Sequence, residues 1–181
     1  MSTVLKRFVI SLSIISLFLS GVAATTRGTG EAAAASTDPR TGMTFPKRIG
    51  AFEREGGIES DAASYPEATY LAGRVALASV FYYKDAAFPT EYANARDAVK
   101  MKTSSARLIS DGPSNLHPGG RRAVFTCEDT FFGAPKTKLM SELLMFPHRD
   151  HYLTFRITYL ASHADRAHRE IDTFVRGFKL P

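Results

Sequence analysis

The sequence predicts an α+β domain with a mainly antiparallel sheet of about six strands and two principal helices packed on it. Strand-like runs occur in two groups of neighbours, and one amphipathic helical pattern follows each group. The order is therefore βββ-α-βββ-α, whereas strands that alternate with helices would predict a doubly wound parallel sheet.

The first group holds three predicted strands, at residues 45–54, 68–71 and 74–83. Gly73 separates the second from the third and predicts a hairpin. Residues 74–83 are apolar or aromatic at nearly every position, so both faces of this strand are expected to be buried and the strand to be central.

A first helix is predicted after Pro89 and Thr90. Its apolar positions recur at helical spacing: Tyr92, Ala95, Val99, Ala106 and Ile109. Asp111, Gly112 and Pro113 predict its end.

The second group holds predicted strands at residues 122–129, 137–146 and 151–160. The turn at 147–150 predicts a hairpin between the last two. In the last strand, Leu153 and Phe155 alternate with Thr154 and Arg156, which predicts one buried face and one wetter face.

The closing helix is predicted to start at Ser162 as N-cap, with Asp165 three positions later. Arg166 and Glu170 stand at i,i+4 on its polar side, as do Asp165 and Arg169. Its apolar stripe consists of Ala164, Ala167, Ile171, Phe174, Val175 and Phe178.

The element order resembles the PsbP/Mog1-like α/β/α sandwich over residues 42–181. The segments that support the resemblance are Phe45-Pro46, Phe81-Tyr82-Tyr83, Pro89-Thr90 and Phe155-Arg156-Ile157-Thr158-Tyr159. Small exported bacterial proteins of unknown function are similar too. The resemblance implies an accessory or binding domain and transfers no functional residue.

Residues 1–24 have the pattern of a secretory signal peptide. Lys6 and Arg7 precede an apolar run over residues 8–19, and small residues lead to a predicted cleavage after Ala24. The run is shorter than the roughly 20 apolar residues that span a bilayer, although an uncleaved anchor is the alternative. The expected location is periplasmic or secreted, with no transmembrane span after cleavage.

Residues 25–41 read as a disordered linker because they are rich in Thr, Gly and Ala. The folded domain is then a single unit over residues 42–181, and a chain of this length can bury one core without metals or bridges.

Charge and cysteine content argue against a nucleic-acid-binding protein and against a disulfide-stabilised one. The formal net charge of +5 falls to 5 − 2 = +3 without Lys6 and Arg7, and the remaining basic residues are scattered, so no nucleic-acid partner is expected. Cys127 is the single cysteine, so no intramolecular disulfide forms; its strand parity places it toward the core.

No nucleophile elbow, phosphate loop, dithiol or zinc-protease motif occurs, and no cofactor is predicted. A metal site at His148, Asp150 and His151 is one hypothesis, because two imidazoles and a carboxylate flank one turn. The alternative is a solvated polar turn.

A second hypothesis is a ligand or partner contact formed by Tyr82, Tyr83, Phe131 and Phe132. Tyrosines offer apolar area with a polar tip, and the Phe131-Phe132 pair reads as part of a surface loop. The alternative is that these aromatic side chains fill the core.

The sequence thus favours an exported, non-enzymatic accessory or binding domain of the cell envelope, with an unknown protein or small ligand as partner. The rival is a periplasmic, hydrolase-like enzyme or metal-binding protein. Its candidate residues are His117, Glu128, Asp129, His148 and His151. A concave cluster of these side chains would favour the enzyme, and a scattered arrangement the binding domain.

Overall fold

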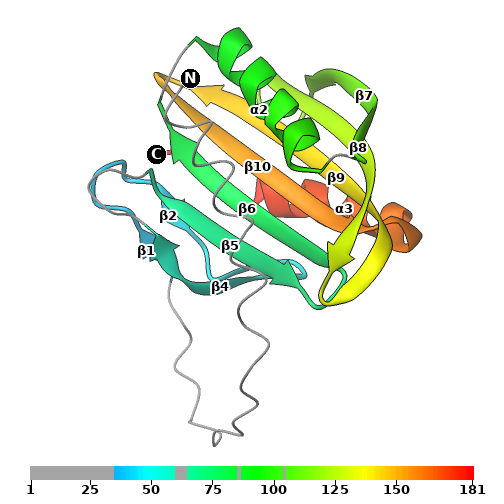
Figure 1. The fold of residues 1–181 in the computed structure, drawn as a ribbon. Helices are drawn as coiled ribbons and strands as arrows, with labels where there is room; N and C mark the ends of the chain where they lie inside the picture. The colour runs from blue at the N-terminus through cyan, green and yellow to red at the C-terminus, as the bar shows by residue number, and fades with distance from the viewer. Residues whose placement is uncertain (1–34, 60–64, 85–86, 104) are drawn as a thin grey trace, which may run out of the picture.

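The computed structural model describes residues 35–59, 65–84, 87–103 and 105–181. These residues form an antiparallel sheet of eight strands with one helix on each face, and a two-stranded ribbon beside it. Figure 1 shows α2 in front of the sheet and α3 behind it. The predicted signal peptide lies outside the described residues.

The sheet has the order β3-β4-β5-β6-β10-β9-β8-β7. The strands are, in that order, Arg48–Ile49, Phe52–Glu59, Glu67–Ala72, Ala76–Tyr83, His151–Leu160, Ala134–His148, Gly120–Phe131 and Arg107–Ser114. The two groups of strands meet where β6 pairs with β10, from Tyr83 opposite Tyr152 to Ala76 opposite Tyr159. As predicted, β6 is a central strand.

The predicted number of six strands is wrong, and the first reason lies in residues 45–54. This segment is not one strand: it is divided among β2 (Thr44–Phe45), β3 and the start of β4. Pro46 lacks a backbone donor, and Gly50 takes a φ of +56° in the turn between β3 and β4.

The second reason lies after α2 (Phe88–Lys102), which ends earlier than predicted. Residues 107–114 form the edge strand β7 and do not continue the helix. Gly112 and Pro113 end a helix but are tolerated on an edge strand, whose outer side needs no ladder hydrogen bonds. The apolar match at Ala106 and Ile109 was therefore accidental.

The hairpins are confirmed. Gly73 turns between β5 and β6 with a φ of +57°, and Arg149 turns between β9 and β10 with a φ of +54°. Strands β8 and β9 extend beyond their predicted ends, so Phe132 and Gly133 form the tight turn between them.

The closing helix α3 (Ala164–Arg176) covers the sheet with the predicted apolar stripe. Its Phe174 stacks on Phe52 at 4.3 Å between ring centroids, and Phe178 meets Phe155 edge-on at 5.2 Å. The start of the helix differs from the prediction: a short 3₁₀ turn (Ala161–His163) comes first, and His163 occupies the N-cap position without a side-chain cap. Of the two predicted polar pairs, Arg166 and Glu170 form an ion pair at 2.7 Å.

Both faces of the central strands are covered. On β10, Leu153, Phe155 and Ile157 enter the core beneath α3, whereas Tyr152 enters the core beneath α2. The prediction of a wetter face is wrong for Thr154 and Arg156, which are 0% and 5% exposed. The α2-side core consists of Tyr83, Tyr92, Ala95, Ala98, Val99, Ala123, Phe125, Leu143, Met145 and Tyr152.

Residues 35–41, assigned to the linker by composition, are partly ordered. Ser36–Thr37 form β1, which pairs with β2. The buried Asp38 carboxylate accepts hydrogen bonds from the backbone N–H groups of Arg40 and Thr41, at 3.1 and 2.9 Å. Among the described helices, none is long and apolar enough to cross a membrane.

A substitution of Gly120 tests the tight packing at the start of β8. A Cβ atom there would lie 2.3 Å from the Phe146 ring, within the core beneath α3. We expect Gly120→Ala to lower the free energy of unfolding by about 1–3 kcal/mol in urea denaturation. Gly112→Ala is the matched control, because its Cβ would meet nothing within 4 Å; equal stability of the two variants would contradict the packing.

Candidate functional site

Three of the four predicted aromatic contact residues lie on strands, and the four do not form one exposed surface. Tyr82 and Tyr83 are 2% and 1% exposed on opposite faces of β6, and Phe131 is 8% exposed at the end of β8. Phe132 is half-buried in the adjoining turn and meets the Phe131 ring edge-on. The aromatic side chains therefore contribute mainly to packing.

The predicted metal ligands point to different partners. His148 Nε2 lies 2.9 Å from the carbonyl of Pro181, whereas His151 Nδ1 lies 2.6 Å from Asp150. Asp150 also accepts a hydrogen bond from Lys84 at 2.6 Å, and the Lys84 and His151 hydrogen bonds hold its pKa at about 2. Within the described residues, no three His, Cys, Asp or Glu side chains form a metal-binding group.

The residues of the predicted enzyme do not form one group: His148 and His151 lie opposite each other on β9 and β10, whereas Glu128 and Asp129 lie toward the other end of β9. Glu128 pairs with Lys138 near the start of β9, and His148 ends the same strand ten residues later, about 33 Å away at the rise of an extended strand. His117 packs against the Phe146 ring at 4.9 Å. The two acids are therefore remote from His148 and His151.

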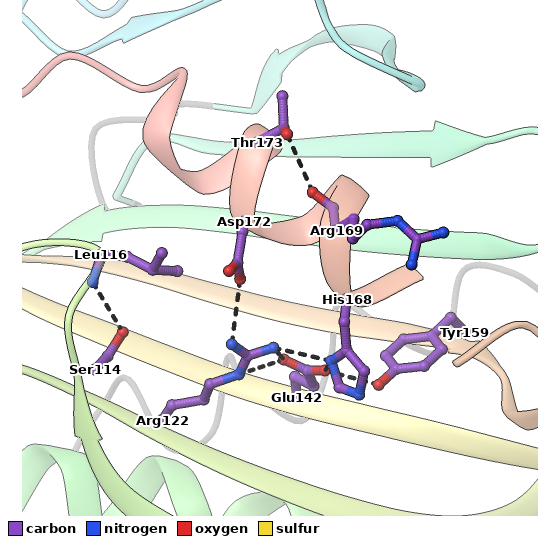
Figure 2. Close-up of polar contacts among 9 residues, drawn as sticks. All are labelled: Ser114, Leu116, Arg122, Glu142, Tyr159, His168, Arg169, Asp172 and Thr173. Carbon is purple, nitrogen blue, oxygen red and sulfur yellow. Dashed lines mark hydrogen bonds and ion pairs between the residues drawn. The ribbon is translucent and has the colours of Figure 1, made fainter. Parts of the chain in front are cut away.

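The structure instead gathers polar groups around Glu142, which is completely buried on β9 (Figure 2). Its Oε2 accepts from Arg122 Nε on β8 at 2.7 Å. Its Oε1 accepts from the Tyr159 hydroxyl on β10 at 2.7 Å and lies 3.0 Å from His168 Nδ1 on α3. The carboxylate therefore links three strands to the helix that covers them.

Hydrogen-bond donors occupy both oxygens of the Glu142 carboxylate. Arg122 also pairs with Asp172 of α3 at 3.2 Å, which holds the guanidinium in place. Burial, followed by the adjacent Glu142, raises the pKa of Tyr159, so its hydroxyl remains a neutral donor. Because its oxygens are occupied by donors, Glu142 supports the packing of α3 and is poorly placed to act as a base or metal ligand.

Sequence reasoning did not single out Glu142, although a signal was present. It is the only charged residue in the apolar run of residues 139–146. A charge at a buried strand position requires a partner, and the partners come from β8, β10 and α3, which are remote in sequence.

A second polar cluster joins α2 to the edge of the sheet. Asp111 on β7 accepts from Tyr92 and Arg96 of α2 at 2.8 and 2.9 Å, and from Arg121 of β8 at 2.6 Å. Burial favours the neutral acid, but the hydrogen bonds from Arg121, Arg96 and Tyr92 outweigh it and lower the pKa of Asp111.

Three exposed apolar side chains lie close together in the sequence where α2 leads into β7. Met101 is 63% exposed in the last turn of α2, and Leu108 and Ile109 are 40% and 56% exposed on β7. The pairing register shifts between Leu108 and Ser110, so Ile109 sits at a bulge of this edge strand. We call Met101, Leu108 and Ile109 the β7 patch.

No protein-family model and no curated protein matches the sequence. Three solved structures are similar in fold. A putative regulator of unknown function from Pseudomonas aeruginosa shares 12% identity at a TM-score of 0.49, over 82% of this chain and 96% of that one. A variant of the protein Mog1 shares 12% identity at a TM-score of 0.48, over 76% and 89%.

The third structure is the cyanobacterial PsbP protein CyanoP from Synechocystis. It shares 14% identity with this chain at a TM-score of 0.50, over 89% of this chain and 100% of that one. The chain has a PsbP/Mog1-like fold. This confirms the resemblance drawn from element order. At this level of identity the likeness of the PsbP/Mog1-like chain to CyanoP extends to the fold alone.

The Glu142 cluster is tested by removing one partner at a time. Glu142→Ala leaves the Tyr159 hydroxyl without its acceptor and Arg122 with Asp172 as its remaining carboxylate partner, so we expect a loss of about 3 kcal/mol in the free energy of unfolding. Tyr159→Phe removes one hydrogen bond and should cost about 1 kcal/mol. Chemical denaturation measures both, and a double variant that costs the full sum would contradict coupling between the two side chains.

The Asp111 cluster predicts a pH dependence. Because its pKa is lowered in the folded state, Asp111 stabilises the fold above the unfolded value of 3.8, and this contribution is lost as pH falls through the folded value. Asp111→Asn should cost about 1–2 kcal/mol near neutral pH, with a smaller difference from wild type near about pH 3. Denaturation across this range measures it, and a difference independent of pH would contradict the assignment.

Proposed function

We propose that this chain is an exported, non-enzymatic binding domain of the cell envelope, and that an extended segment of a partner protein docks along β7. The observation that supports this most strongly is the β7 patch. Three large apolar side chains lie exposed within nine positions of the chain, and two of them lie on a strand at the edge of the sheet.

An edge strand of eight residues offers unpaired backbone groups as well as apolar side chains. Folded proteins ordinarily blunt such an edge with charges, proline or a covering segment. In β7 the proline is at position 113 and Asp111 turns toward α2, so both lie in its second half. The first half carries the exposed Arg107 and the bulge at Ile109 beside the apolar Leu108 and Ile109, and strand addition there would pair the backbone and cover the patch.

The rest of the molecule favours binding over catalysis. Both oxygens of the most deeply buried carboxylate described, Glu142, accept hydrogen bonds, and His148 and His151 bond to different partners although they lie opposite each other. Export is supported by the charged start and apolar run of residues 1–24, which lie outside the described residues.

Site-specific photo-crosslinking in the producing cells tests the proposal. We expect a photoreactive residue at Ile109 of the full-length chain to form an adduct with one envelope protein. The same residue at Thr90, exposed in the first turn of α2, is the matched control and should form none. Met101→Lys should weaken the Ile109 adduct, because it introduces a charge into the apolar contact.

Two outcomes would contradict the proposal. One is retention of the chain in the cytoplasmic fraction with residues 1–24 still attached. The other is adduct formation that is equal at Ile109 and Thr90, which would indicate random collision. An adduct that joins two copies of this chain would replace the proposed partner by self-association.

A further inference from the structure

Arg156 is a buried cation that lacks a bonded partner among the described residues. It lies at the middle of β10 on the face covered by α2, and it is 5% exposed. Its Nε and Nη1 atoms are enclosed and make no hydrogen bond. Nη2 is not among the enclosed, unpartnered atoms.

The side chains around Arg156 are unusually rich in hydroxyl groups for the middle of a sheet. Ser79 of β6 stands directly opposite Arg156, and Thr154 and Thr158 flank it on the same face of β10. Thr154 Oγ1 is also enclosed without a hydrogen-bond partner. Ser141 of β9 lies 3.4 Å from Thr158 between hydroxyl oxygens, which places it at the border of the same group.

The buried Arg54 also has an unpartnered Nε, but both of its terminal nitrogens donate hydrogen bonds, to the Phe45 carbonyl and to Ser36 Oγ. The half-buried Arg122 binds Glu142 and Asp172. Burial lowers the pKa of Arg156 to about 10, and the electrostatic influence of Cys127 and Asp129, neither of which bonds to it, offsets this only in part. Asp129 is an exposed residue near the end of β8, and Cys127 has its own pKa raised by burial, which keeps the thiol neutral.

An enclosed guanidinium without an anion is costly, because desolvation of the charge is not repaid by a hydrogen-bonded partner. We propose that Arg156, with the hydroxyls of Thr154 and Ser79, forms a binding site for the carboxylate group of a small organic acid. The planar guanidinium matches a carboxylate, and the hydroxyls supply further donors to its oxygens.

The charge of the site favours a monoanion. One carboxylate neutralises the charge of Arg156. A phosphate dianion would leave one negative charge uncompensated in an enclosed space, where Asp129 already contributes a negative electrostatic potential. This site lies on the sheet face beneath α2 and is independent of docking at the β7 patch, so either proposal can fail alone.

Acetate is the probe for the test, and the full-length chain is labelled with ¹⁵N at arginine. The Nε–H of an enclosed guanidinium exchanges slowly and gives a resolved NMR signal. We expect acetate to shift the Arg156 signal saturably and to raise the melting temperature, with phosphate weaker at equal concentration and ionic strength. A saturable effect of acetate on Arg156 that phosphate does not exceed supports the site.

Variants separate binding from folding. Arg156→Leu should weaken acetate binding by at least about tenfold while the apo protein stays as stable as wild type or becomes more stable, because a buried charge has been removed. Thr154→Val removes one hydroxyl and should weaken binding several-fold. Arg176→Leu, at an exposed arginine of α3, is the control for general charge effects and should leave the affinity unchanged.

The proposal fails if acetate leaves the Arg156 signal unmoved, or if Arg176→Leu abolishes the effect as Arg156→Leu does. Tighter binding of phosphate than of acetate would overturn the assignment to a carboxylate. If Arg156→Leu does not fold, the wild-type titration and Thr154→Val still decide the question.

Discussion

The sheet is covered by a helix on each face, and this burial limits how the polar side chains of its central strands can be solvated. Along residues 139–146 of β9 and 152–157 of β10 neither face is open to water, so a charge there must find a partner inside the protein. Glu142 meets this requirement with donors from β8, β10 and α3. Arg156, on the opposite face, does not. The same constraint therefore produces a closed structural cluster on one face and an unsatisfied donor group on the other.

The edges of the sheet follow from the same arrangement. The helices cover the middle strands, which leaves β7 at one edge with Leu108 and Ile109 exposed. The Asp111 cluster holds this strand to α2 through Tyr92 and Arg96. The backbone of β7 is therefore held in place next to its exposed residues. An edge that is anchored but uncovered is well suited to receive another strand, because little order has to be gained on docking.

The candidate sites were harder to predict than the fold. Histidines and aromatic side chains near turns drew attention in the sequence, yet Tyr82 and Phe131 are buried and His148 bonds to the carbonyl of Pro181. The informative residues were charges inside apolar strands, Glu142 and Arg156. Strand periodicity places such residues on a face but does not reveal whether a helix covers that face, and this decides whether they meet water, a partner or neither.

By itself, the sequence determined the α+β class, the β5–β6 and β9–β10 hairpins, the apolar stripe of α3 and the burial of Cys127. Each follows from spacing or turn chemistry within about 15 residues. Only the tertiary structure decided that residues 107–114 form an edge strand, that β6 pairs with β10, and that Arg156 lies enclosed without an anion. These features depend on contacts between segments distant in the chain, whose energies local propensity does not contain.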